Sequence, residues 1–237
     1  MSALAGTTGA HPRAVVSWSS GKDAAFALHA VRQTGALDVV GLLTTVTSTY
    51  RRVSMHGVRE ALLEAQARAV GLPLLKVEIP SPCPNAVYER AMAGAVDRLR
   101  RDGVTRMVFG DLFLEDVRAY REDRLRGTGI DPVFPLWGRP TGVLAREMIA
   151  GGLDARLVAI DPRALPRSFA GRRFDRTLLD DLPSDVDPCG ERGEFHTCVV
   201  AGPMFDRPIA VNAGEVVDRD GFVFADLAPA APTPATP

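Results

Sequence analysis

One stretch near the beginning of the chain, residues 14–24, limits what the polypeptide can fold into more than any other. It opens with a short apolar run and continues through serines, a glycine, a lysine and an aspartate into a helix-like pattern. This order predicts a buried strand, a tight turn and a helix N-terminus. There, unpaired backbone N–H groups and the positive end of the helix dipole favour an anion. The stretch therefore predicts a phosphate-binding site.

The loop does not fit the common phosphate loop G-x-x-x-x-G-K-[ST]. Val16 stands at the leading glycine position, and Asp23 stands where the Ser or Thr that holds Mg²⁺ belongs. The sequence at residues 19–24 is Ser-Ser-Gly-Lys-Asp-Ala, which resembles the S-G-G-x-D-S signature of the PP-loop ATP pyrophosphatases. Those enzymes cleave ATP between its α and β phosphates. Ser20 replaces the first glycine and Ala24 the final serine, so one hydroxyl is lost. A strand, turn and helix without a ligand is the alternative for this stretch alone.

Composition narrows the class of protein. The chain has 237 residues, 46% of them hydrophobic, which is enough for one large domain or two modest ones. With 28 basic and 29 acidic residues there is no broad field to attract nucleic acid or an anionic membrane. The thiols Cys83, Cys189 and Cys198 are odd in number and lack C-x-x-C spacing, which favours reduced cysteines in a cytoplasm. No apolar run reaches the length of a membrane span, and residues 1–13 lack a signal-peptide pattern, so we expect a cytoplasmic protein.

Strand-like and helix-like segments alternate through the first half of the chain. Strands are predicted at residues 38–46, 74–79 and 104–109, and helices at residues 58–70, 85–101 and 112–122, with Asn85 as an N-cap. Such alternation predicts a parallel sheet with helices on both faces. Ligands bind at the carboxyl ends of the strands in this architecture. That position points to the polar loop at residues 47–57 and to Gly110 and Asp111, which directly follow the fourth strand.

The second half of the chain predicts a smaller α+β domain. Glycines and prolines near residues 127–135 mark a boundary, followed by a helix at residues 141–150, strands at residues 155–160 and 195–200, and a hairpin within residues 215–224. We therefore expect a disordered start at residues 1–13, an ATP-binding domain at 14–130, a substrate-closing domain at 131–227 and a disordered tail at 228–237. The arginines of residues 163–176 predict a solvated basic face, with a phosphate or protein contact as the alternative.

A second group of polar residues lies at residues 187–197, Asp-Pro-Cys-Gly-Glu-Arg-Gly-Glu-Phe-His-Thr. Its glycines allow the backbone to approach a ligand closely, while Glu191, Glu194 and His196 supply acids and an imidazole. A zinc site formed by Cys189, His196 and Cys198 is an alternative, although their spacing is not that of a common zinc module.

With both groups in view, the chain resembles the diphthine-ammonia ligase family of PP-loop proteins, as a bacterial-type member. The resemblance extends over residues 15–227 and lies in the segments 19–23, 54–57, 110–121, 135–137 and 190–197. It implies a Rossmann-like (HUP-type) domain, of the kind called adenine nucleotide α-hydrolase, and a smaller C-terminal α+β domain that closes over the substrate.

The resemblance also implies a reaction, ATP-dependent amide formation. A carboxylate attacks the α-phosphate, pyrophosphate leaves, and ammonia displaces AMP from the acyl-adenylate. The implied cofactors are ATP and Mg²⁺. The implied nucleotide-binding residues are Ser17, Ser19, Ser20, Gly21, Lys22, Asp23 and Gly110, with Asp23 also on Mg²⁺. The implied catalytic residues are Asp111, Glu191, Glu194 and His196.

The acceptor and two alternative functions are left open by the sequence. Diphthine belongs to a translation factor of eukaryotes and archaea, whereas the arginine-rich, lysine-poor composition suggests a high-GC bacterium. We therefore expect a small-molecule or protein-borne carboxylate as acceptor, with ammonia as co-substrate and the formation of a homodimer undecided. A tRNA-modifying PP-loop enzyme and a non-catalytic protein that binds adenine nucleotides are the alternatives.

Overall fold

The structure, a computed structural model, describes residues 11–54 and 56–230. Most of the expected disordered start and tail therefore lies outside the described residues. At both borders, however, residues expected in those segments form strands. Arg13 begins β1 (Arg13–Ser17) and pairs with Asp38, and Ala228 and Pro229 end β10 (Phe222–Pro229) paired with its neighbour strand. These residues belong to the fold because their backbones pair with an adjacent strand, and composition alone does not reveal such pairing.

The predicted fold class is confirmed, and its larger part is a six-stranded sheet. The strand order is β3-β2-β1-β5-β6, with β4 also paired to β2, and all pairs are parallel except that of β3. The other strands are β2 (Asp38–Thr47), β3 (Arg52–Val53), β4 (Leu74–Ile79), β5 (Arg106–Val108) and β6 (Asp131–Val133). The chain reverses its direction of travel across the sheet beside β1, which is where this architecture places ligands.

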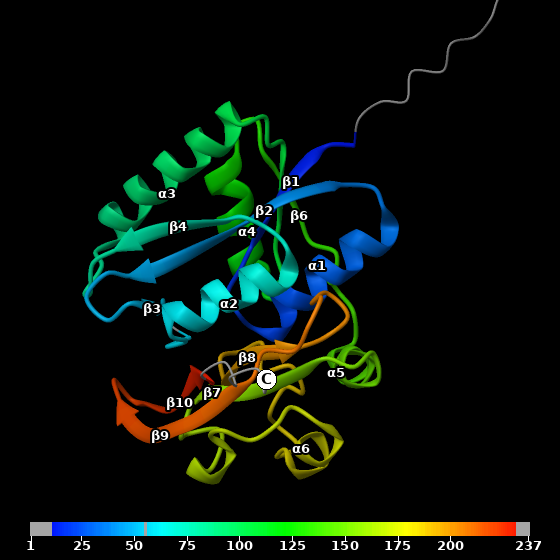
Figure 1. Ribbon diagram of the computed structural model, residues 1–237, viewed down its shortest axis with the longest axis vertical. Helices are drawn as coiled ribbons and strands as arrows, with labels where there is room; N and C mark the ends of the chain where they lie inside the picture. The colour runs from blue at the N-terminus through cyan, green and yellow to red at the C-terminus, as the bar shows by residue number, and fades with distance from the viewer. Residues whose placement is uncertain (1–10, 55, 231–237) are drawn as a thin grey trace, which may run out of the picture.

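Helices cover both faces of this sheet, as Figure 1 shows. They are α1 (Lys22–Thr34), α2 (Glu60–Val70), α3 (Asn85–Arg101) and α4 (Glu115–Leu125). Alternate residues of β1 point to opposite faces: Ala14 and Val16 join the apolar cluster that contains α1 and α2, and Val15 joins the cluster that contains α3. Central strands that are buried on both faces explain the continuous apolar runs of the sequence.

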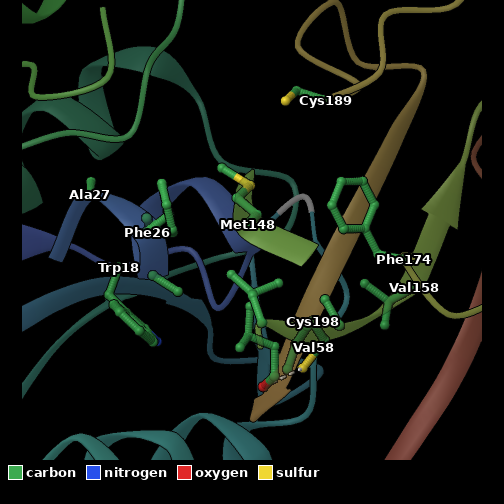
Figure 2. Close-up of a cluster of buried hydrophobic side chains, with 14 of the residues drawn as sticks. Trp18, Phe26, Ala27, Val58, Met148, Val158, Phe174, Cys189 and Cys198 are labelled. Carbon is green, nitrogen blue, oxygen red and sulfur yellow. Dashed lines mark hydrogen bonds between the residues drawn. The ribbon is translucent and has the colours of Figure 1, made fainter. Parts of the chain in front are cut away.

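The second part is a four-stranded antiparallel sheet with the order β8-β7-β10-β9. Its remaining strands are β7 (Asp154–Ile160), β8 (Phe195–Ala201) and β9 (Val211–Arg219), accompanied by α5 (Thr141–Ala150), the 3-10 turn Arg167–Phe169 and α6 (Arg176–Asp181). In Figure 1 this sheet lies beside α1 and α2. One apolar cluster joins the two parts, and Figure 2 shows Val58 of the first part beside Cys198 of the second, with Trp18, Phe26 and Val158 in the same cluster.

The expected boundary after residue 130 falls just before β6, which pairs with β5 and thus belongs to the first sheet. We propose a boundary between β6 and α5 instead.

Asn85 does not cap α3, because Pro84 occupies the N-cap and Asn85 is the first helical residue. Among the described helices, none combines the length and the apolar character that crossing a membrane requires.

The basic segment at residues 163–176 is a surface of ion pairs. Arginines of this segment pair with acids as follows: Arg163 with Asp161, Arg167 with Asp218, Arg172 with Asp181, and Arg173 with Asp154. These pairs favour the solvated basic face over a phosphate site.

Candidate functional site

A cavity of about 900 Å³ opens at the carboxyl ends of the parallel strands. Its wall includes Ser17 at the end of β1, Ser19 just after it, Thr44 and Thr45 of β2, and Phe109 after β5, together with residues of α3 and α4. Small-molecule sites commonly occupy roughly 300–1,000 Å³. The cavity is therefore large enough for a nucleotide, and it lies where an open α/β sheet binds its ligand.

The loop between β1 and α1 has a left-handed residue at one of its signature positions. Ser20 has φ of 70°, in the left-handed region that favours glycine, and it occupies the position of the signature's first glycine. Its side chain is buried, and its Oγ has no hydrogen-bond partner. Gly21 caps α1 in an extended conformation, and its N–H donates to Ser19 Oγ at 3.3 Å. Ser17 and Ser19 line the cavity, so the loop lies along its edge.

Gly110 explains how β5 approaches the start of α1. A Cβ at this position would lie 2.7 Å from the backbone N of Ala24 and 2.7 Å from the backbone C of Asp23. Real Cβ atoms do not approach backbone this closely. The glycine therefore allows the strand end to touch the first turn of the helix, and Gly110 is not among the residues that line the cavity.

The C-terminal sheet binds the loop directly. The backbone N–H of Lys22 donates to Thr197 Oγ1 at 3.0 Å, and the backbone N–H of Val199 donates to the carbonyl of Ser20 at 2.9 Å. Gln66 of α2 bridges the same two segments, since its Nε2 donates to the carbonyls of Ser20 at 3.1 Å and Val199 at 2.7 Å. The loop is thus held between α2 and β8.

Lys22 faces the C-terminal segment and is not among the residues that line the cavity. Its buried Nζ donates to both carboxylate oxygens of Asp23, at 3.0 and 2.8 Å, and to the carbonyl of Cys189. The rings of Phe174 and Phe195 lie 5.6 and 5.4 Å from the same nitrogen. Burial disfavours the charged form, but Asp23 and the surrounding acids outweigh it and raise the pKa of Lys22.

The polar segment at residues 187–194 is shaped by its own carboxylates. Asp187 Oδ2 accepts hydrogen bonds from the backbone N–H groups of Cys189 at 3.1 Å and Glu191 at 3.0 Å. Glu194 is buried and accepts from the N–H groups of Asp187 and Arg192, both at 2.9 Å. The carboxylates of Asp187 and Glu194 therefore both hold the turn in shape through backbone N–H groups. Glu194 thus has a structural role in this segment.

Glu191 has the environment of an acid or base. Its Oε1 accepts the backbone N–H of Leu112 at 2.7 Å, just after β5. Burial raises the pKa of Glu191 to about 7, and the neighbouring carboxylates of Asp23 and Asp111 act in the same direction. A carboxyl group that titrates near neutrality can both accept and return a proton at physiological pH.

Asp111 forms a bidentate ion pair with Arg121 of α4. The Arg121 Nε and Nη2 atoms lie 2.5 and 3.0 Å from the two carboxylate oxygens of Asp111. The guanidinium also lies 4.5 Å from the ring centre of Phe109, and Arg121 lines the cavity. Asp111 therefore orients a cation at the cavity wall. Arg121 was missed as a site residue in the sequence, where it is one of many charges in a mixed-charge helix.

His196 packs against a second histidine, His56, at a ring-centre distance of 4.4 Å. Burial holds the pKa of His56 well below its usual value, and the charges of His196 and Lys22 lower this pKa further. Burial and Lys22 lower the pKa of His196 to about 4. Both rings are thus uncharged at neutral pH. His56 lines the cavity, and its place in the loop after β2 is the signal that could have identified it.

The described ranges 11–54 and 56–230 contain no group of three His, Cys, Asp or Glu side chains that could hold a metal ion. Burial raises the pKa of Cys198 to about 12, which keeps that thiol protonated. Mg²⁺ bound with a nucleotide needs only one or two carboxylates, because phosphate oxygens and water complete its shell. Asp23 offers that kind of oxygen donor. The charge of Asp187 acts on Asp23, and the charge of Asp23 acts on Glu191, so the three carboxyl groups lie close together.

Comparison with known proteins gives matches over both parts of the fold. The family models described as diphthamide synthase N-terminal domain and diphthamide synthase C-terminal domain match residues 12–132 and 141–225. The chain is 26% identical over 194 residues to proteins named diphthine–ammonia ligase from Homo sapiens and Bos taurus, covering 76% of this chain and 71% of each relative. The protein of that name from Danio rerio is 27% identical over 179 residues, covering 68% of this chain and 69% of the relative.

Proposed function

Because the chain belongs to the diphthamide synthase family, we propose that it is an ATP-dependent, amide-forming ligase that releases AMP and pyrophosphate. One observation carries the proposal furthest. The loop beside the cavity has a left-handed residue, Ser20, before an extended helix cap, and β8 holds it in place through Thr197 and Val199. A loop fixed in one conformation at a helix N-terminus suits the binding of a triphosphate.

In this proposal the phosphates of ATP lie along the loop at residues 17–23. The cavity-lining Ser17 and Ser19 supply hydroxyl groups for phosphate oxygens. Lys22 acts indirectly, since its ammonium holds Asp23 and the carbonyl of Cys189. Bound Mg²⁺ at Asp23 would offset negative charge on the leaving pyrophosphate.

The remaining residues serve the two chemical steps. Asp111 fixes Arg121 at the cavity wall, where the guanidinium attracts the acceptor carboxylate or the phosphates. Holding the carboxylate in line with the α-phosphorus allows it to displace pyrophosphate and form the acyl-adenylate. Glu191 then accepts or returns a proton, and Glu194 keeps the turn that carries Glu191 in shape. His196 lies beside the cavity-lining His56.

The acceptor follows from the names of the relatives. The similar proteins from Homo sapiens and Bos taurus are named diphthine–ammonia ligase, so we propose a carboxylate acceptor and ammonia for this chain by similarity. We propose a carboxylate acceptor, protein-borne as in diphthine or a small molecule, and a cytoplasmic location consistent with the free cysteines Cys83, Cys189 and Cys198.

The proposal is tested by acceptor-dependent exchange of labelled pyrophosphate into ATP. The purified protein is given ATP, Mg²⁺ and in turn a diphthine-bearing translation factor and a panel of small carboxylic acids. We expect exchange with one acceptor class, and its loss in Asp23→Asn, with Arg167→Ala as the matched surface control. ATP binding without exchange for every acceptor would contradict the ligase and favour a protein that only binds the nucleotide.

A further inference from the structure

Two buried side-chain polar atoms in the described part of the chain have no hydrogen-bond partner, Ser20 Oγ and His56 Nδ1. Buried polar atoms are nearly always paired, so each exception requires a reason, and a bound molecule is a common one. Ser20 belongs to the loop assigned to the phosphates. His56 lies between β3 and α2, lines the same cavity, and has no role in the nucleotide chemistry described above.

His56 is held by the element that also holds the phosphate loop. Its ring lies 4.4 Å, centre to centre, from the ring of His196 in β8, at an interplanar angle of 47°. The next residue of β8, Thr197, accepts the backbone N–H of Lys22. His56 therefore lines the cavity with its unpaired nitrogen enclosed next to the wall, close to the loop where an acyl-adenylate would form.

The surroundings of His56 favour an uncharged hydrogen-bond donor as its ligand. The titratable and charged groups that act on its ring are His196 and Lys22, and Lys22 also acts on His196. An uncharged imidazole presents one nitrogen that accepts a hydrogen bond. Burial, together with the Lys22 charge that acts on both rings, disfavours a cation here. For the same reason the site disfavours ammonium relative to ammonia, and ammonia is the form that carries a free electron pair.

This inference rests on the proposed ligase function. We propose that His56 is the ammonia-binding residue of the site, accepting an N–H hydrogen bond at Nδ1, and that His196 is the positioning residue that holds its ring. The electron pair of ammonia attacks the acyl carbon and forms the C–N bond. The bond from that carbon to the AMP oxygen breaks, and AMP leaves with the electron pair. One N–H proton passes to His56 Nδ1 and from there to water, so the products are the amide, AMP and a proton.

A titration without acceptor tests the binding step. Protein labelled with ¹⁵N in its histidines is titrated with ammonium chloride at constant ionic strength, and parallel titrations use potassium chloride and tetramethylammonium chloride. We expect a saturable shift of the His56 and His196 ring nitrogens with ammonium chloride alone. The His196 shift should disappear in His56→Gln and persist in the control His11→Gln, because His11 is an exposed histidine at the start of the described chain. An unshifted wild type, or an unchanged His196 response in His56→Gln, would overturn the assignment.

Kinetics with the acceptor that supports pyrophosphate exchange test the proton step. In His56→Gln we expect exchange within about twofold of wild type, while ammonia-dependent amide formation falls roughly 10²–10³-fold. Hydroxylamine, which is largely unprotonated at neutral pH, should restore product formation as the hydroxamate. Equal loss of exchange would show that His56 serves the nucleotide instead, and full activity with ammonia would refute a role for His56. Absence of exchange in the wild type contradicts the ligase proposal, whereas the titration decides on His56 in either case.

Discussion

Replacing Gly110 by alanine should displace the phosphate loop without altering any side chain of the cavity. The added Cβ would lie 2.7 Å from backbone atoms of Asp23 and Ala24, which is 0.7 Å shorter than the 3.4 Å at which ordinary van der Waals contact begins. Both contacts are with backbone in the first turn of α1, so no flexible side chain can move away. Overpacking of this kind costs about 1–3 kcal/mol of the free energy of unfolding.

The same substitution should weaken ATP binding, because separating β5 from α1 moves the loop along which we propose that the phosphates lie. We expect a loss of at least about tenfold in ATP affinity, which corresponds to roughly 1.4 kcal/mol. Gly94→Ala is the matched control: its Cβ would meet nothing within 4 Å in the exposed interior of α3, and it should stabilise the protein by about 0.5–1 kcal/mol. Urea unfolding and calorimetric ATP titration measure both effects. Wild-type stability and affinity in Gly110→Ala would refute the close approach of β5 and the loop.

Three further substitutions test other parts of the site. Ser20→Gly should raise the free energy of unfolding by about 1 kcal/mol and retain ATP binding, because a left-handed residue without a paired hydroxyl becomes glycine; a destabilised variant would contradict the strain. Gln66→Leu should cost at least about 3 kcal/mol in urea unfolding, because it leaves buried partners unpaired in Trp18, Ser20 and Val199, whereas the exposed Gln33→Leu should be near neutral. For Glu191, the folded pKa of about 7 lies above the ordinary 4.5, so folding stability should decline as pH rises from about 4.5 through 7 while the carboxylate becomes available as a base. Glu191→Gln should abolish that decline and the rise in turnover centred near pH 7, and an unchanged pH profile would exclude Glu191 as the proton acceptor.

Some elements with a clear pattern were predicted to the residue, whereas α2 and α4 begin two and three residues later than their patterns indicate. The strand at β4 and the helices α3 and α5 have the bounds that their patterns indicate, and the hairpin of β9 and β10 turns at Asp220 and Gly221 as predicted. Local apolar spacing determines these segments, so a single sequence reveals them. In contrast, β6 contains a proline and only three residues. It is a strand because β5 offers it a parallel partner, and a long-range pairing has no local signature.

The direction of a side chain was harder to predict than its place in a motif. The spacing assigns Lys22 to a phosphate loop, but its ammonium turns to the carbonyl of Cys189, 167 positions further along the chain. The pair of His56 and His196 and the orientation of Arg121 by Asp111 likewise depend on how separate segments pack. The motifs and their order along the sequence were therefore sufficient to predict the class of protein. The roles of individual side chains in the site could be assigned only from the way that separate segments pack.

The central claim is that the loop at residues 17–23 presents the α-phosphorus of ATP, not the γ-phosphorus, to the attacking group. Following ATP by ³¹P NMR, with Mg²⁺, ammonia and the acceptor present, tests it most directly. The account predicts AMP and pyrophosphate in equal amounts, formed only when the acceptor is supplied. ADP and orthophosphate as the products would contradict it.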